Sequence, residues 1–497
     1  MIKLEVYNTK VTIRGRLPEG TSIKIDKSAS YKHAGYLFVN KFKSSKNNWD
    51  GVIRLFRYNS FPIGLLHRVK EILKSDGVKF EVVDNRAKPK YGKAIGLKNS
   101  KFKFREYQKK ALDAAIKNGS GVVKMATGSG KTFTLSSIVA NYNVKTMIYV
   151  IGVELMYQMH ETLKAAYGID AGMIGDGKCD IKKINIATIW SAASAFNKKI
   201  EVLDSDVTYD KSSNKDIDKK KVRDAVQSAE LLILDECQYA AASTVQFLHR
   251  ESKSAIHRFL FSASPWRDTG DDILIEAVGG PKIFDLDAST LIRKDFLVRP
   301  HIYFVNVPSI RGVGKTYQEV YKNYIVENDI RNDLIKQSVE KLLAKKRKIL
   351  ILVVRINHGK KISKLLSNDY KVEFLDGKKS SAQRLKAIEG MKNGDIDVLI
   401  ASKIFDQGID IPELDALILA GSGKSSGRAL QRIGRVIRKA DGKDKAIVVE
   451  FFDHAKYLRS HSEARMTVYQ SEPEFKIIKS DKKVYNTYVK RKPTKWV

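Results

Sequence analysis

One stretch decides the fold of this chain: Met125-Ala126-Thr127-Gly128-Ser129-Gly130-Lys131-Thr132, which follows an apolar run at Gly121–Lys124 and precedes an apolar helical pattern. A strand, a loop of small residues and a helix, in that order, are what a nucleotide-phosphate loop requires. Small side chains let backbone N–H groups close around phosphate oxygens, and the N-terminus of the helix adds its dipole. The stretch therefore predicts an α/β domain with a nucleotide site at the end of a strand.

The residues of this loop have distinct predicted roles. Lys131 would reach the β- and γ-phosphates, and Thr132 would offer its hydroxyl to Mg²⁺. The phosphates would also contact the preceding residues Thr127, Gly128, Ser129 and Gly130. The generic pattern has a glycine where this chain has Met125, so the match is to the variant A-T-G-S-G-K-T. A chance Gly-Lys-Thr turn is the alternative, and the strand and helix around the loop argue against it.

A second element supports the nucleotide site. Leu231-Leu232-Ile233-Leu234-Asp235-Glu236 is an apolar strand that ends in two carboxylates. Asp235 suits a Mg²⁺ ligand, usually through water, and Glu236 suits a group that polarises the attacking water. The alternative is that these carboxylates cap a neighbouring helix. The phosphate loop upstream favours the phosphoryl-transfer interpretation.

Short apolar runs alternate with helical patterns over much of the chain, which favours parallel α/β sheets. The first set of predicted strands is Val122–Met125, Thr146–Ile151, Ile184–Ala187, Leu231–Asp235 and Phe259–Ser262. The second set is Ile349–Val354, Val372–Leu375, Val398–Ala401, Ala416–Ala420 and Ala446–Phe451. A charge-rich stretch at about 197–225 is predicted as a surface loop, and residues 301–346 carry long helical patterns. We expect two α/β lobes joined near residues 286–305.

The excess positive charge of the chain indicates what kind of partner it binds and does not indicate its fold. Lys and Arg number 90 and Asp and Glu 56 among 497 residues, a formal charge of +34 that most simply indicates a polyanion. The length allows about three domains. Two cysteines, Cys179 and Cys237, exclude a disulfide framework or a Cys-rich metal site, which favours a reducing compartment and cytoplasmic localisation. A membrane-surface protein would need a basic amphipathic helix, and none stands out.

The excess charge is densest at the two ends. Residues 1–100 carry 21 Lys and Arg against 8 Asp and Glu, or +13, and residues 454–497 carry 11 against 4, or +7. Strand-like runs at 4–6 and 79–83 with a helical pattern at 64–73 predict a small, basic α+β domain, with residues 84–103 as a linker. Near the C-terminus, Tyr485, Tyr488 and Trp496 would stack on bases, or the segment is a solvated extension.

Several motifs in the first lobe resemble those of the superfamily-two helicases and translocases. Asp235-Glu236-Cys237-Gln238 is similar to the DEAD/DEAH-type box of that family, and Phe104-Arg105-Glu106-Tyr107-Gln108 resembles its adenine-recognition element. The resemblance implies that Gln108 reads the adenine edge with Arg105 and Tyr107 beside it. Ser262-Ala263-Ser264 resembles the S-A-T element, so Ser262 and Ser264 would couple ATP hydrolysis to strand movement.

The second lobe carries the later motifs of the same family. Residues 401–412 resemble motif V, and the resemblance places Gly408 and Asp410 at the nucleotide. Gln431-Arg432-Ile433-Gly434-Arg435-Val436-Ile437-Arg438 closely matches motif VI, Q-x-x-G-R-x-x-R. Gln431 would couple the lobes, and Arg435 and Arg438 would stabilise the transferring phosphoryl group as arginine fingers do. The family then implies ATP and Mg²⁺ between two RecA-like parallel-sheet lobes.

Nucleic-acid contacts follow from the resemblance and are harder to place. The candidates in the two lobes are Gln158, Thr188, Arg355 and Ser402, which would touch phosphates. Thr188 is equally suited to capping a helix, and Gln158 to a helix surface. In the N-terminal region, residues 35–38, 48–55, 58–59 and 61–65 resemble the phage UvsW-type helicases, and the likeness favours a homologue from a T5-like phage.

That narrower resemblance implies an activity and a partition of the chain. The resemblance to UvsW-type enzymes implies ATP-driven branch migration of Holliday junctions, fork regression, and unwinding and annealing of DNA. It also implies movement with 3′-to-5′ polarity. We expect the protein to be a monomer that binds single-stranded, duplex and branched DNA. Arg54, Arg57 and Arg68 are the candidates for duplex phosphates, whereas Trp49 also suits a core position. An RNA helicase, a double-stranded DNA translocase without net unwinding and a non-catalytic scaffold remain alternatives. The predicted domains are 1–90, 91–290, 291–455 and a basic C-terminal extension, 456–497.

Overall fold

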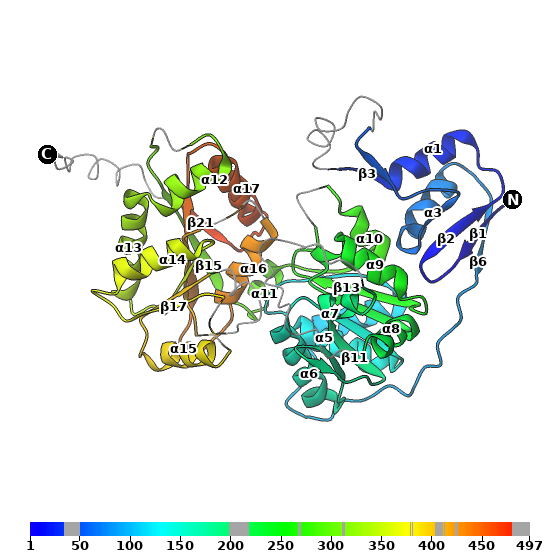
Figure 1. Ribbon diagram of the computed structural model, residues 1–497, viewed down its shortest axis with the longest axis horizontal. Coiled ribbons are helices and arrows are strands. Elements are labelled where there is room, and N and C mark those ends of the chain that lie inside the picture. The colour runs from blue at the N-terminus through cyan, green and yellow to red at the C-terminus, as the bar shows by residue number, and fades with distance from the viewer. Residues whose placement is uncertain are drawn as a thin grey trace. The chain divides into compact units, whose positions relative to one another are not determined.

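The computed structural model describes residues 1–33, 50–197, 218–266, 270–310, 314–377, 379, 381–402, 411, 413–421, 423 and 426–479. The chain forms two compact units (Figure 1). The first comprises Met1–Met125 and Gly130–Leu286, and the second comprises Asp287–Val497 with Ala126–Ser129. Trp49, Gly408, Asp410, Tyr485, Tyr488 and Trp496 lie outside the described residues, so the predictions for them stay predictions.

The first unit begins with the small α+β domain that the sequence predicts, called the N-terminal module below. Its sheet has the order β5-β2-β1-β6, in which β1 and β6 are parallel and the other pairs antiparallel. A separate antiparallel pair joins β3 and β4. The bounds are β1 Ile2–Val6, β2 Lys10–Arg14, α1 Glu19–Ser28, β3 Ser30–Lys32, β4 Val52–Arg54, β5 Ser60–Pro62, η1 Ile63–Leu65, α3 Leu66–Ser75 and β6 Phe80–Asp84.

The larger sheet of the first unit has the order β10-β9-β11-β8-β12-β13-β7-β14. Every pair is parallel except β9 and β10, so the connections between successive parallel strands are crossovers, most of which contain helices. The strands are β7 Gly121–Met125, β8 Thr146–Val150, β9 Gly172–Gly175, β10 Lys178–Cys179, β11 Ile184–Thr188, β12 Leu231–Asp235, β13 His257–Ser262 and β14 Lys282–Leu286. The helices are α4 Glu106–Asn118, α5 Lys131–Tyr142, α6 Val153–Tyr167, α7 Ile189–Ser194, α8 Lys219–Ser228, η3 Cys237–Tyr239, α9 Ser243–Glu251 and α10 Ile273–Gly279.

The charge-rich stretch predicted as a loop at 197–225 proves helical at its end. α8 begins at Lys219, and Val222 and Val226 are both buried one helical turn apart. The Lys219–Lys221 run conceals this amphipathic spacing, because its charges lie on the solvent side while the two valines anchor the helix. Residues 198–217 lie outside the described part of the chain.

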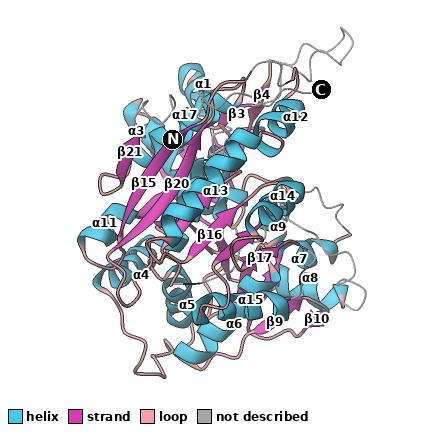
Figure 2. Ribbon diagram, turned by 90° about the vertical axis from the view of Figure 1, so that its left-hand side faces the viewer, coloured by secondary structure: helices cyan, strands magenta, loops and turns pink. Residues whose placement is uncertain are grey.

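The second unit is a parallel sheet with the order β17-β18-β16-β19-β20-β15-β21 (Figure 2). Its strands are β15 Arg299–Asn306, β16 Ile349–Leu352, β17 Val372–Leu375, β18 Val398–Ala401, β19 Ala416–Leu419, β20 Lys445–Phe452 and β21 Lys476–Lys479. Its helices are α11 Ala288–Arg293, α12 Tyr317–Val320, the π-helical turn η4 Tyr321–Val326, α13 Asp329–Leu343, α14 Ile356–Leu366, α15 Ser381–Asn393, α16 Ser426–Val436 and α17 Leu458–Gln470.

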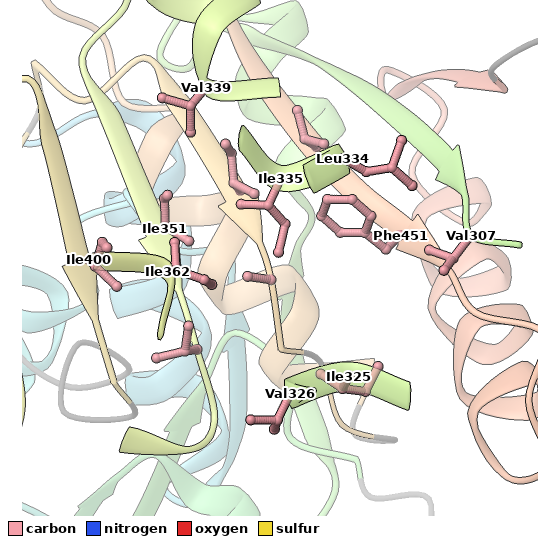
Figure 3. Packing of buried hydrophobic residues seen from close by; sticks show 14 of the residues in the cluster. Val307, Ile325, Val326, Leu334, Ile335, Val339, Ile351, Ile362, Ile400 and Phe451 are labelled. Carbon is pink, nitrogen blue, oxygen red and sulfur yellow. The ribbon is translucent and has the colours of Figure 1, made fainter. Parts of the chain in front are cut away.

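One apolar cluster fixes the strands of the second unit (Figure 3). Ile335 and Val339 of α13 pack with Ile351 of β16, Ile400 of β18 and Phe451 of β20. All five side chains are at most 1% exposed, and burial of each such side chain contributes about 1.5–3 kcal/mol. The cluster thereby holds the strand ends that lead to the second unit's motifs.

The last part of the described chain differs from the predicted C-terminal extension. β21 pairs in parallel with β15, and Ile302 faces Ile477 in the register. Tyr469 of α17 is fully buried, with its hydroxyl donating a hydrogen bond to Glu450 Oε2 at 3.0 Å. Residues 458–479 therefore complete the sheet of the second unit. The sequence obscures this because β21 is a two-isoleucine pair between lysines, too short to show a strand pattern.

The N-terminal module packs against α10 of the same unit. Arg68 donates hydrogen bonds to both carboxylate oxygens of Glu276, each at 2.7 Å. Ile273 and Ala277 of α10 belong to the apolar cluster of the module. At Gly64 a Cβ atom would lie 1.8 Å from the Glu276 carbonyl oxygen, so only glycine permits this close approach. The module is therefore a built-in part of the first unit.

The segment predicted as a linker runs along the same unit without helix or strand. Tyr91 Oη lies 2.7 Å from His257 Nε2. Two backbone hydrogen bonds follow, from Ile95 N–H to the Ala140 carbonyl at 2.9 Å and from Lys98 N–H to the Ala166 carbonyl at 2.8 Å. Asn143 adds two more bonds, to Gly92 N–H and to the Lys93 carbonyl, so residues 85–105 form a strap that is fixed to the first unit at several places.

Candidate nucleotide and nucleic-acid site

The predicted phosphate loop connects β7, a strand buried except at Lys124, to the first turn of α5. Gly128 has φ +84° and Gly130 has φ +80°, a left-handed conformation that glycine adopts without strain. At Gly130 a Cβ atom would also lie 2.5 Å from Gln108 Nε2. The small residues are therefore required by the backbone, as a loop that presents N–H groups to phosphate needs.

Lys131 and Glu236 meet within the first unit. Lys131 Nζ lies 3.4 Å from Glu236 Oε1, and the two side chains are 14% and 21% exposed. Burial alone would lower the pKa of Lys131, but the carboxylates of Glu236 and Asp235 outweigh it and raise that pKa. The ammonium is therefore charged at neutral pH and is available to neutralise phosphate charge.

The two strand-end carboxylates differ in their surroundings. Asp235 is 6% exposed, and burial raises its pKa against the lowering effect of Lys131. Glu236 is the next residue, has φ +56° and donates its N–H to Asp235 Oδ1 at 3.0 Å. A non-glycine residue in the left-handed region is uncommon and frequent at functional sites. The turn directs one carboxylate into the strand end and the other toward Lys131.

A chain of hydrogen bonds leads from Glu236 to the S-A-S element. Gln238 Nε2 donates to Glu236 Oε2 at 3.0 Å, and Ser262 Oγ donates to Gln238 Oε1 at 2.8 Å. Ser264 N–H then donates to Ser262 Oγ at 3.0 Å. The sequence placed Ser262 and Ser264 in a coupling role but did not identify Gln238 as their link. Its position as the fourth residue of the box was the signal.

The predicted adenine element gathers beside the same loop. Arg105 Nη1 donates to Tyr107 Oη at 2.8 Å, and Arg105 N–H donates to Gln108 Oε1 at 3.0 Å. Gln108 is 4% exposed, and its amide borders Gly130. The structure therefore brings the three residues together at the start of α4, next to the phosphate loop.

These residues fit a nucleotide with Mg²⁺. The fit rests on the glycine-dependent loop, the buried ammonium of Lys131, the Thr132 hydroxyl in the first turn of α5 and the buried Asp235 carboxylate. Oxygen donors of this kind are what Mg²⁺ prefers when it enters with a phosphate ligand. In the described part of the chain no group of three or more His, Cys, Asp or Glu could hold a metal by itself.

In the second unit, motif VI lies on α16 and just beyond it. Gln431, Gly434 and Arg435 follow one another at helical spacing on α16. Arg438 lies past the end of the helix, where its backbone bridges to Leu297. Of the predicted motif V, Ser402 is described, is 6% exposed and donates its N–H to the Leu375 carbonyl at 3.1 Å.

Two buried arginines that sequence reasoning missed hold the loop leading to α16. Arg331 of α13 pairs with Asp453 at 2.9 Å and donates to the Ala420 carbonyl at 2.5 Å. Arg465 of α17 pairs with Glu450 and donates to the Gly423 carbonyl at 3.2 Å. Each arginine thus connects a buried carboxylate to the backbone just before motif VI.

The candidate nucleic-acid contacts in the two units have varied surroundings. Gln158 is exposed on α6. Thr188 is 4% exposed and caps α7, with its hydroxyl accepting from Ser191 N–H at 3.2 Å, which matches the capping alternative. Arg355 lies over the ring of Tyr321 at 5.1 Å. Buried Ser402 and capped Thr188 offer little surface to a phosphate.

The three candidate arginines of the N-terminal module also differ. Arg54 pairs with Asp26 at 3.2 Å and Asp50 at 2.5 Å. Arg57 is exposed at a hairpin turn. Arg68 pairs with Glu276 of α10 at 2.7 Å and so takes part in the packing of the module, and its contact with duplex phosphate stays a prediction. The three side chains therefore have different sets of partners, and their contacts with nucleic acid stay predictions.

Comparisons with known proteins identify the units. The family model described as "Type III restriction enzyme, res subunit" matches residues 101–267, and the model "Helicase conserved C-terminal domain" matches residues 332–440. The first match includes the phosphate loop, the carboxylate box and the S-A-S element. The second includes α13 and motif VI. No described helix is long and apolar enough to cross a membrane.

Three relatives are similar over most of this chain. A protein of Sulfolobus islandicus filamentous virus, named as a helicase, is 25% identical over 389 residues, 73% of this chain and 66% of the relative. The DNA 3′-5′ translocase XPB2 of Sulfurisphaera tokodaii is 23% identical over 391 residues, 71% of this chain and 82% of the relative. The ATP-dependent DNA helicase uvsW of Enterobacteria phage T4 is 25% identical over 455 residues, 86% of both.

Proposed function

Since this chain is a superfamily-two helicase with two RecA-like lobes and resembles UvsW, we propose that it is an ATP-dependent DNA helicase that remodels branched DNA. The proposed reactions are branch migration of Holliday junctions, fork regression, unwinding and annealing. The observation that carries the motor function is the hydrogen-bonded chain from Lys131 through Glu236 and Gln238 to Ser262. It joins the phosphate loop to the S-A-S element at the end of β13.

The chemistry of the proposed hydrolysis follows from this geometry. The loop 126–130 and Lys131 would hold the phosphates, while Asp235 and Thr132 would bind Mg²⁺, which neutralises phosphate charge when bound. Glu236 would orient the attacking water, because its carboxylate lies beside the ammonium that marks the terminal phosphate. Arg435 and Arg438 keep the role implied by motif VI, which is to stabilise charge on the phosphoryl group.

Coupling is proposed to run through Gln238. A change in the position of Glu236 as the phosphate leaves would alter the hydrogen bond to Gln238 and, through it, the contact with Ser262. β13 ends at Ser262, and α10 follows soon after in the chain. The arrangement therefore gives nucleotide state a direct path to the part of the first unit that carries the N-terminal module.

The names of the relatives favour DNA and 3′-to-5′ movement. T4 uvsW is named a DNA helicase, and XPB2 is named a DNA 3′-5′ translocase. The charge of +13 over residues 1–100 supports a nucleic-acid contact in the module. The name of XPB2 also keeps translocation on duplex DNA without net unwinding as a second candidate.

The deciding experiment compares ATP hydrolysis by the full chain with a forked DNA, a Holliday junction, linear duplex, single-stranded DNA and RNA. Branched DNA is expected to stimulate most, with strand displacement or branch migration on the same substrates. Glu236→Gln serves as the inactive control. Equal stimulation by RNA would favour an RNA helicase, and stimulation by duplex without strand displacement would favour the translocase.

A further inference from the structure

Among the large apolar and aromatic side chains described in the N-terminal module, the most exposed one, Tyr58, lies at a tight hairpin turn. Arg57 and Ser60 exchange two backbone hydrogen bonds, at 2.9 Å and 2.8 Å, so that only Tyr58 and Asn59 form the turn. Both have positive φ, +52° and +54°. Two positive φ angles define a type I′ turn, whose twist matches that of the strands it joins.

Tyr58 is an unfavourable residue for this turn. Type I′ turns prefer Asn, Asp or Gly because a bulky side chain is strained in the left-handed region. Asn59 follows that preference and Tyr58 does not. The Tyr58 side chain is 99% exposed, so core packing does not account for it either. A strained residue without a packing role indicates a functional constraint.

Hydrogen bonds to the neighbouring strand β2 hold the turn in place. The Asn59 carbonyl accepts a hydrogen bond from Ile13 N–H at 2.7 Å, and the hydroxyls of Ser60 and Thr12 lie 3.1 Å apart. Phe61, the next residue, is 2% exposed in the module core. The ring of Tyr58 is therefore presented to solvent on a fixed base, which lowers the conformational entropy lost when a ligand binds.

A basic residue is the immediate chain neighbour of Tyr58. Arg57 precedes Tyr58, is exposed, and is turned back by a hydrogen bond from its Nε to the Arg54 carbonyl at 3.1 Å. An exposed aromatic ring next to a guanidinium is the combination that binds unpaired nucleic acid. The ring stacks on a base, and the guanidinium neutralises its phosphate. A protein partner would not explain the basic character of the whole module as simply.

We propose that Tyr58 is a stacking site for an unpaired base, with Arg57 on the adjoining phosphate. This inference rests on the proposed function and extends it by naming where the module recognises the point at which strands part. The turn continues through β5 into η1, whose Gly64 packs on α10. A base held by Tyr58 is therefore held by the unit that carries Lys131.

The test uses the full chain and a forked DNA with 2-aminopurine at the first unpaired position. Tyr58→Asn removes the ring and supplies a residue that the turn prefers, so the melting temperature is expected to be unchanged or higher. Tyr58→Trp keeps the stacking. Tyr7→Asn removes another partly exposed tyrosine of the same module and serves as the matched control.

Wild type and Tyr58→Trp should quench the 2-aminopurine fluorescence, and Tyr58→Asn should not. Tyr58→Asn should also weaken binding to forked DNA by about 5- to 100-fold, with little effect on linear duplex, because one stacked base is lost. Equal quenching and affinity in Tyr58→Asn and wild type would overturn the inference. Equal loss on linear duplex would also overturn it.

The outcomes separate this inference from the proposed function. If DNA does not stimulate ATP hydrolysis by the wild type, the proposed function fails. If the wild type is stimulated and Tyr58→Asn behaves as the wild type on forked DNA, only the stacking site fails.

Discussion

Glu236 is constrained both by its backbone conformation and by two side-chain partners in the candidate site. It has a left-handed backbone, lies 3.4 Å from Lys131 Nζ and accepts a hydrogen bond from Gln238. The left-handed conformation costs about 1–2 kcal/mol, which the rest of the unit offsets. Such a cost is reasonable where the direction of one carboxylate matters more than local stability.

Glu236→Gln is expected to lower kcat for ATP hydrolysis by roughly 10²–10⁴-fold, because the amide cannot accept a proton from water. The fold should persist, since the two side chains have the same shape. The measurements are steady-state hydrolysis and binding of a non-hydrolysable ATP analogue, and the analogue should still bind. Full activity in this variant would contradict the assigned role.

Gln238→Leu tests the link between Glu236 and Ser262. Loss of a hydrogen bond to a charged group is worth about 1.5–3 kcal/mol, which predicts a fall in kcat of about 10- to 100-fold. The KM for ATP should change less, because Gln238 donates to Glu236 and accepts from Ser262, a link expected to act on hydrolysis more than on ATP binding. Ser262→Ala should give a milder effect in the same direction. An effect confined to KM would argue against a coupling role.

At the scale of elements, strands were predictable where they are continuous apolar runs. β12 and β16 lie in the centres of their sheets and consist wholly of buried residues, so their sequences admit little else. β21 and β14 lie at sheet edges and contain lysine or aspartate beside only two or three apolar residues, which weakens the strand pattern. Pairing with a distant strand decides their structure, and the local sequence does not contain that information.

The loop before α16 depends on helices far away in the sequence. Arg331→Met is expected to destabilise the protein by about 3–5 kcal/mol, because Asp453 would remain buried without its partner. The double variant Arg331→Met with Asp453→Leu should recover most of that stability, since an apolar pair can replace a buried ion pair. Thermal unfolding measures both effects.

The double variant separates stability from positioning. It still lacks the hydrogen bond to the Ala420 carbonyl, so ATP hydrolysis should stay below wild type at matched stability. A rescued protein with full activity would show that Arg331 acts on stability alone. The sequence did not reveal this arginine, because its role appears only when α13, β19 and β20 are assembled.

At the scale of the whole molecule, the pH dependence of stability reports on how the N-terminal module packs against α10. Burial alone would raise the pKa of Glu276, but hydrogen bonds from His67 and Arg68 outweigh it and lower that pKa to about 2. A carboxyl with a lowered pKa in the folded state stabilises the fold above its ordinary pKa near 4.5. This contribution is lost as the pH falls from about 5 toward 2.

Glu276→Gln should lower stability at neutral pH by about 1–2 kcal/mol, less than for a fully buried pair because Arg68 is partly exposed. The difference from wild type should shrink as the pH falls below about 4.5. Glu81→Gln, in a surface pair with Lys3, is the matched control and should show little effect. A difference independent of pH would contradict the assignment. Thermal unfolding over the pH range is the measurement.

The motifs of the site were predictable because their chemistry fixes residue types at short spacing, as in the loop 125–132. Their tertiary partners were not, since Gln238 and Glu276 show their roles only through contacts made by the fold. Arg68 illustrates the difference. Its charge made it a candidate for duplex phosphate, which stays a prediction, while its carboxylate partner on α10 lies more than two hundred residues away, where no local pattern could reveal it.

The strap over residues 85–105 has a consequence for exchanging parts between related motors. A chimera that carried residues 1–105 onto another motor would leave Tyr91, Ile95 and Lys98 facing a host surface that lacks their partners. A graft cut at the end of β6 leaves the strap on its own motor and needs only the surface of α10 from its host. Transplantable boundaries are therefore set by where the backbone begins to bond to the motor, and the start of α4 is a poor guide.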